Sequence, residues 1–199
     1  RIEEIQRALP EGVEIVPYYD RTALVDRTIA TVGKHLAEGA LLVIVVLLIL
    51  LVNLRAGLVL ASVIPLAMMF AFIGMWITGT SANLMCLGAI DFGLVVDGSL
   101  IIVENVLRRI GVMQKESRGE LSKEAFRKLV YEGTLEVRKV AQFGEVIILV
   151  VYLPILFLRG IEGKLFVPMA LTVSFALIGA VILSITYVPV MCSLVFNPE

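Results

Sequence analysis

Three carboxylates lie within one strongly apolar stretch of the sequence, residues 87–105: Asp91, Asp97 and Glu104. The residues around them are mainly Val, Leu, Ile and Gly. A carboxylate inside a bilayer is costly unless it is paired, hydrated or protonated. A segment that keeps three of them predicts a membrane protein that moves protons or cations.

The spacing of these residues predicts two polar stripes on one helix. A helix turns by about 100° per residue, so residues seven positions apart lie about 20° apart in projection and two turns apart along the axis. Asp97 and Glu104 have this spacing, and Asp91, Gly98 and Asn105 repeat it on a neighbouring stripe. Glycine beside each stripe lets another backbone or water come close.

A helix over about 84–108 would place Asp97 near the middle of the membrane. Asp91 would then lie nearer the outer surface and Glu104 nearer the cytoplasmic surface, as a ladder of titratable groups. A proton carrier must reach both of its protonation states, and a nearby cation favours the charged one. Apart from Arg108 at the end of the third span, none of the five expected spans contains Lys or Arg. The cationic partner of Asp97 is therefore expected from a helix outside this chain.

Structural interpretations stay open for several acids. Glu104 could pair with Arg108, one turn further along the same helix. Asp91 could hydrogen-bond the backbone of a loop. Glu145 lies about one and a half turns into a later apolar run, near the cytoplasmic side, where interfacial snorkelling is favoured.

Other chemistry has little support in the sequence. His35 and Glu38 are three residues apart, but one such pair is a weak metal signal, and an ordinary interfacial histidine is favoured. Cys86 and Cys192 both lie in apolar runs and are expected to be buried thiols. There is no phosphate loop, Ser-His-Asp arrangement or zinc-type cysteine cluster, so we expect no catalytic residue and no cofactor.

Composition predicts a helical membrane bundle, because 59% of the 199 residues are hydrophobic and the mean hydropathy is +0.95. Each apolar run is long enough for a hydrocarbon core of about 30 Å at about 1.5 Å per residue. Pro65 is expected inside one span and Pro154 at a kink in another. The five expected membrane spans are about 36–54, 57–77, 84–108, 140–158 and 166–192.

Two further segments complete the expected fold. Residues 119–136 alternate charged and apolar side chains at helical spacing, which indicates an amphipathic helix along the membrane surface or a plain solvated linker. Residues 1–20 indicate a short helix and then a strand at 13–19, too little to bury a core alone. The expected class is an all-α membrane protein with a small N-terminal αβ remnant, divided at residue 35.

Basic residues predict the orientation. Nine Lys and Arg lie in residues 108–139, and Arg55 lies in the turn after the first span. The positive-inside rule puts both segments in the cytoplasm. Residues 1–35 then lie outside, and the C-terminus lies inside.

A known family has similar motifs. Residues 91–99, followed by 102–105, closely resemble the acidic fourth transmembrane helix of heavy-metal efflux pumps of the resistance-nodulation-division superfamily. The resemblance covers essentially the whole chain. The other similar segments are residues 19–22, 38–42, 151–156 and 161–170.

The resemblance implies a fragment of a secondary active transporter rather than an enzyme. The five spans would match the second to sixth helices of a twelve-helix pump, and residues 1–35 the end of its periplasmic porter domain. Such pumps are homotrimers in the inner membrane of Gram-negative bacteria. They work with a periplasmic adaptor and an outer-membrane channel, and couple proton influx to cation export. Asp91, Asp97 and Glu104 match acids implicated in proton translocation, paired with residues of the pump's other half.

The substrate is inferred from the branch of the family. Asp at both 91 and 97, with Ile102 instead of a methionine, resembles the zinc, cobalt, cadmium and nickel branch rather than the copper and silver branch. The metal-site ligands would lie in the porter domain, outside this chain, so they are unknown. Two alternatives stay open: an exporter of drugs or other organic substrates in the same superfamily, and a non-transporting scaffold.

Overall fold

The computed structural model describes residues 10, 21–51, 53–80, 86, 88, 90–116 and 123–196. Within these ranges the chain is helical and contains no strand. The short helix and strand expected in residues 1–20 lie outside them, apart from Pro10. The elements are α2 (Arg21–Leu51), α3 (Leu54–Thr78), α5 (Phe92–Glu116), α6 (Lys123–Tyr152), the 3-10 helix η1 (Leu153–Phe157), α7 (Gly160–Ile185) and α8 (Tyr187–Val195).

Four helical segments of the described chain are long and apolar enough to cross a membrane. They correspond to four of the five expected spans. The remaining expected span corresponds to α5, which has the length but carries Asp97, Glu104 and a basic C-terminal part. The four apolar segments are Val25–Leu51, Leu54–Thr78, Lys123–Phe157 and Gly160–Ile185.

The helix boundaries differ from expectation in two places. α5 begins at Phe92, later than the predicted start near residue 84. α6 runs without interruption from Lys123 to Tyr152, so most of the expected surface helix and the following span are one continuous helix. No proline falls within α6 to break it. The expected kink at Pro154 is a change from α-helix to the 3-10 helix η1.

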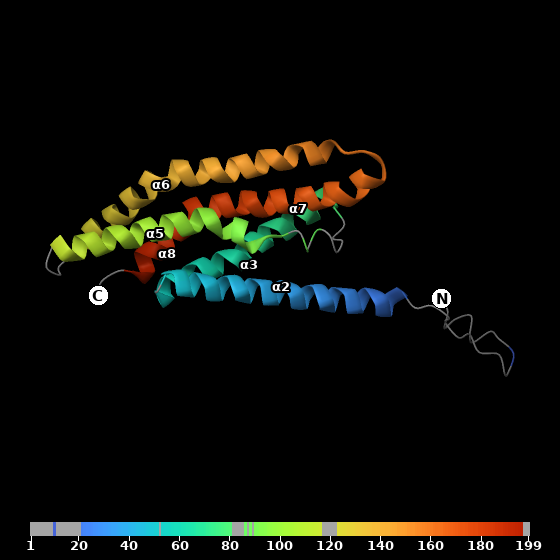
Figure 1. The fold of residues 1–199 in the computed structure, drawn as a ribbon, viewed down its shortest axis with the longest axis horizontal. Helices are drawn as coiled ribbons and strands as arrows, with labels where there is room; N and C mark the ends of the chain where they lie inside the picture. The colour runs from blue at the N-terminus through green and yellow to red at the C-terminus, as the bar shows by residue number, and fades with distance from the viewer. Residues whose placement is uncertain are drawn as a thin grey trace.

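The bundle is built around two helix pairs. α3 packs most extensively against α7, and α5 against α6. Among the described helices, α2 contacts only α3 and α5. Figure 1 shows α2 along one side of the bundle and α6 along the opposite side. Leu47 is the buried apolar residue that α2 contributes to the core. Most of the α2 surface is apolar and exposed, as expected of a helix that faces lipid.

Glycines allow α3 and α7 to approach closely. A Cβ atom at Gly74 of α3 would overlap the ring of Phe175 in α7. In the same way, a Cβ atom at Gly179 of α7 would overlap Phe70 of α3. Each helix therefore receives an aromatic side chain of the other over a glycine, which is the small-residue packing typical of membrane helices.

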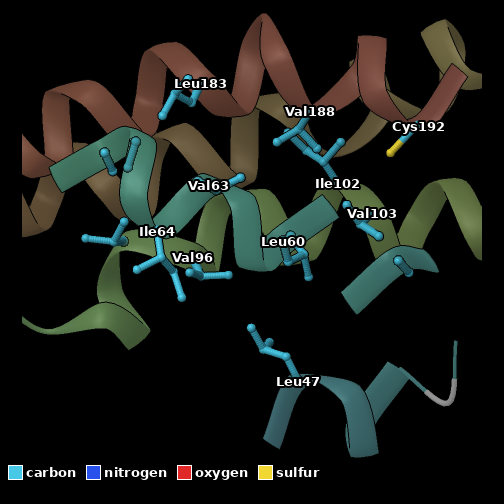
Figure 2. Packing of buried hydrophobic residues seen from close by; sticks show 14 of the residues in the cluster. Leu47, Leu60, Val63, Ile64, Val96, Ile102, Val103, Leu183, Val188 and Cys192 are labelled. Carbon is cyan, nitrogen blue, oxygen red and sulfur yellow. The ribbon is translucent and has the colours of Figure 1, made fainter. Parts of the chain in front are cut away.

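The core lies where α3, α5, α7 and α8 meet. Figure 2 shows Leu60 and Val63 of α3 beside Val96 and Ile102 of α5, with Val188 of α8 close by. Since these side chains are at most 2% exposed, one side of α5 is fixed against the bundle. The opposite side of α5 is left for polar residues.

Two cavities mark the two ends of α5. At one end, Arg55 and Gln114 line a cavity of about 630 Å³, so the start of α3 is level with the last turns of α5. We call this the basic end, since Arg108 also lies near it. At the other end, His35 and Asp91 line a cavity of about 590 Å³ between α2 and the start of α5. We call this the Asp91 end.

Candidate functional site

α5 presents two of the predicted carboxylates on one open face. Asp97 and Glu104 are exposed, as are Ile101 between them and Arg108 one turn further on. Steps of four, three and four residues keep all four side chains on one side of a helix. Asp97 and Glu104 therefore share one face of α5, as the sequence spacing predicts. No described helix covers this face.

Asp91 is separated from this face because it precedes the helix. Its Oδ1 accepts a hydrogen bond from Gly93 N at 2.8 Å. Its carbonyl oxygen accepts one from Val95 N at 3.3 Å. These bonds satisfy backbone N–H groups of the first turn of α5, which otherwise have no partner. Asp91 therefore hydrogen-bonds the first turn of α5, whereas the alternative that the sequence left open was the backbone of a loop.

The position of Asp97 along α5 is set by where this helix begins. It is the sixth residue of α5, about 8 Å from Phe92 along the axis at about 1.5 Å per residue. Gln114, at the level of Arg55, is about 25 Å further along at the same rise. Asp97 therefore lies nearer the Asp91 end than the middle of the helix. The place of Asp97 near the middle of the membrane stays a prediction.

The pairing of Glu104 with Arg108 is not formed. Arg108 Nη2 instead donates to Asn105 Oδ1 at 2.8 Å and lies 3.9 Å from Glu136 Oε2. In the described part of the chain, the ion pairs within 4 Å involve other acids, namely Glu38, Glu132 and Glu136. Glu104 therefore remains available on the open face.

A network at the basic end ties α5 to α6. The buried amide of Asn105 donates from Nδ2 to Gly133 O at 2.7 Å and to Glu136 Oε2 at 2.9 Å. Arg109 Nε donates to the same Glu136 oxygen at 3.0 Å. The hydrogen bond from Asn105, then that from Arg109, holds the pKa of Glu136 below its ordinary value. Asn105, expected on a polar stripe with Asp91, is a link between helices.

Glu145 is a correction to the sequence interpretation. It does not snorkel at an interface: its side chain is 4% exposed. Its carboxylate packs on Gly98 of α5, where a Cβ atom would lie 2.6 Å from Glu145 Cδ. α5 and α6 are antiparallel, since Gly133 meets Arg109 while Glu145 meets Gly98. Glu145 is therefore level with Asp97, deep in the bundle.

The burial of Glu145 does not follow from the sequence pattern of α6 alone. Gly98 indicates a place for close approach, but one helix cannot show which side chain approaches it. The available signal was a carboxylate inside an apolar run of α6 that contains no Lys or Arg after Lys139.

The described chain offers no metal site. His35 Nδ1 lies 3.4 Å from Glu38 Oε2 on the exposed side of α2. Among the described residues, no group of three or more His, Cys, Asp or Glu side chains could hold a metal ion. Cys86 and Cys192 are buried, as expected.

The chain belongs to the AcrB/AcrD/AcrF family, whose model matches residues 1–199. Within that family, similar proteins are named for metal resistance and efflux. The chain is 51% identical over 194 residues to the cobalt-zinc-cadmium resistance protein CzcA of Cupriavidus metallidurans, covering 98% of this chain and 18% of that protein. It is 46% identical over 200 residues to the nickel-cobalt-cadmium resistance protein NccA of Alcaligenes xylosoxydans xylosoxydans, covering 100% of this chain and 18% of that one.

A solved structure has the same fold. The crystal structure of a heavy metal efflux pump aligns with a TM-score of 0.81 and 40% identity, covering 98% of this chain and 19% of that one. The cation efflux system protein CusA of Escherichia coli K12 is 35% identical over 194 residues, covering 96% of this chain and 18% of that protein. The chain thus spans about a fifth of the length of its relatives.

Proposed function

We propose that this chain is the part of a proton-driven heavy-metal efflux pump that contains its proton-carrying helix. The observation that carries the proposal is the open face of α5, where Asp97 and Glu104 lie without an ion-pair partner in the described chain. Relatives at 46–51% identity are named as metal-resistance proteins. In such a pump the rest of the polypeptide would cover this face and supply the cation.

The three acids would act in order along α5. Asp91 lies at one end, where it lines the cavity beside α2. Asp97 follows in the second turn, and Glu104 lies two turns beyond it, toward the basic end. A proton that falls through about 100 mV releases about 2.3 kcal/mol, before any pH gradient is counted. That energy would drive the exchange of protons for an exported cation.

Orientation follows from the basic end. With Arg55, Arg108 and the basic part of α6 in the cytoplasm, residues 1–35 are periplasmic and the C-terminus is cytoplasmic. The membrane would be the bacterial inner membrane. The partners would be the remainder of the pump, two further copies of it in a homotrimer, a periplasmic adaptor and an outer-membrane channel.

The proposed substrate is a divalent heavy-metal cation of the zinc, cobalt, cadmium or nickel type. The names of the relatives at 46–51% identity favour it over a drug or other organic substrate. The described chain has no metal-holding cluster, so the ligands that select the metal would come from the porter domain.

The test replaces Asp97 in the full-length pump. Asp97→Asn keeps the size of the side chain and removes its charge, so we expect loss of metal resistance in growing cells with normal pump levels in the membrane. Asp26→Asn, an exposed acid of α2, is the matched control and should leave resistance intact. Normal resistance in Asp97→Asn would contradict the proposal. Export of organic compounds by wild-type vesicles that do not export metals would favour the organic-substrate alternative.

A further inference from the structure

Three buried polar atoms without a hydrogen-bond partner lie at one level of the bundle. In the described part of the chain, they are the only buried side-chain nitrogen or oxygen atoms of this kind: Ser99 Oγ and both carboxylate oxygens of Glu145. Ser99 is fully buried and follows Gly98 directly. Buried polar groups in proteins are satisfied in the large majority of cases, so a cluster of exceptions requires a reason.

The position of Glu145 depends on glycine at residue 98. A Cβ atom there would lie 2.6 Å from Glu145 Cδ and 3.2 Å from Oε2, and would overlap Oε1. Only glycine lets the Glu145 carboxylate reach the backbone of α5 at this point. The Glu145 carboxylate therefore lies against Gly98 on the buried side of α5. Asp97 immediately precedes Gly98 and is exposed.

The electrostatic surroundings of Glu145 are simple. Asp97 is the charged group of the described chain whose field acts on it. The other elements packed against α6 bring no charge to this level, since η1, α8 and residues 165–185 of α7 contain no Asp, Glu, Lys or Arg. Two negatively charged carboxylates at the same level of the bundle repel each other, and a proton bound to either of them removes that repulsion.

We propose that Glu145 is a further proton-carrying residue, which shares one proton with Asp97 across Gly98. The inference rests on the proposed function. In the step, the O–H bond of the Glu145 carboxylic acid breaks and its proton binds the Asp97 carboxylate. The pair has a charge of −1 before and after the transfer. While Asp97 on the open face engages a cation from the rest of the pump, the proton resides on buried Glu145.

Infrared difference spectroscopy of the full-length pump in lipid tests the shared proton without transport. The variants are Asp97→Asn and Glu145→Gln, with Glu124→Gln, an exposed acid of the same helix, as control. We expect two titrating carboxyl bands, each lost in one variant. Loss of either should change the pH midpoint of the other by about one unit or more, as coupled sites require. An unchanged Asp97 band in Glu145→Gln would overturn the inference.

Proton flux in proteoliposomes tests whether the proton on Glu145 takes part in transport. Glu145→Gln should lower metal-dependent proton flux about tenfold, equivalent to about 1.4 kcal/mol, whereas Glu145→Asp should recover part of it and Glu124→Gln all of it. Wild-type flux in Glu145→Gln would overturn the inference while leaving the proposed function in place. If the wild-type pump showed no metal-dependent proton flux, the proposed function would be wrong. The infrared experiment would then still show whether Glu145 and Asp97 share a proton, because it does not depend on transport.

Discussion

The two ends of the α5–α6 interface each contain a glutamate of α6, and the two glutamates differ in their hydrogen bonding. At the basic end, Glu136 accepts hydrogen bonds from Asn105 and Arg109 and lies near Arg108. At the other end, Glu145 is 4% exposed and has no hydrogen-bond partner in the described chain. The same pair of helices therefore contains one satisfied carboxylate and one unsatisfied carboxylate.

This difference separates a structural acid from one that can change its protonation. Glu136 is stabilised in its charged form by two hydrogen-bond donors, Asn105 and Arg109, and by the nearby charge of Arg108. Losing the charge of Glu136 would therefore weaken the contact between the helices. Glu145 has no hydrogen-bond partner in the described chain, and the like charge of Asp97 acts on it. The paired end can hold α5 and α6 together while the unpaired end exchanges a proton. Variants at each end should therefore affect different measurements.

The largest effect should follow from filling the space at Gly98. Gly98→Ala displaces the Glu145 carboxylate and should therefore cause the loss expected for Glu145→Gln. We expect metal transport by the full-length pump to fall about tenfold, equivalent to about 1.4 kcal/mol, while the pump remains folded, since alanine favours a helix. Gly144→Ala, where a new Cβ atom would contact nothing within 4 Å, is the control. Equal transport by both variants would contradict the comparison.

A smaller effect, on stability, should follow at Asn105. Asn105→Ala removes a side-chain donor from Gly133 O and from Glu136. A hydrogen bond contributes about 0.5–1.5 kcal/mol, and one to a charged group about 1.5–3 kcal/mol. We expect a lower unfolding temperature of the detergent-solubilised pump, with transport retained by the folded fraction. Gln114→Ala, an exposed amide of the same helix, should change neither property. If Asn105→Ala lost transport without losing stability, Asn105 would take part in proton transfer, and its structural assignment would be wrong.

The smallest effect should come from Glu136→Gln and should depend on pH. Because the folded pKa of Glu136 lies below its ordinary value, its charge stabilises the fold above that ordinary value. The stabilisation is lost as pH falls through the folded pKa. The unfolding temperatures of wild type and Glu136→Gln should thus differ near neutral pH and converge in acid. The exposure of Glu136 means that added salt should reduce the difference. A difference that grows in acid would contradict this assignment.

Sequence reasoning predicted those parts of the fold that depend on local pattern. Apolar runs located α2, α3 and α7, because a membrane span is defined by length and hydropathy alone. The seven-residue spacing of Asp97 and Glu104 predicted their shared face. The hydropathy pattern predicts too early a start for α5, because it includes Asp91 in the helix. Its hydrogen bond to Gly93 N is the capping chemistry of an aspartate just before a helix.

Features that depend on two helices were out of reach. The burial of Glu145 requires a glycine on another helix at the same level, and a single apolar run does not show that level. The link from Asn105 to Gly133 likewise depends on how α6 packs against α5. The continuity of α6 was within reach, since no proline lies between residues 123 and 152. Its charged first half was instead interpreted as a separate surface helix.

The most direct test compares metal-dependent proton flux for Glu145→Gln and Glu136→Gln, both in the full-length pump in proteoliposomes at equal protein density. Both variants remove one carboxylate from α6, so they differ only in the end of the interface that they change. The account predicts that Glu145→Gln loses most of the flux and that Glu136→Gln keeps it. Equal flux in the two variants, or loss in Glu136→Gln alone, would contradict it.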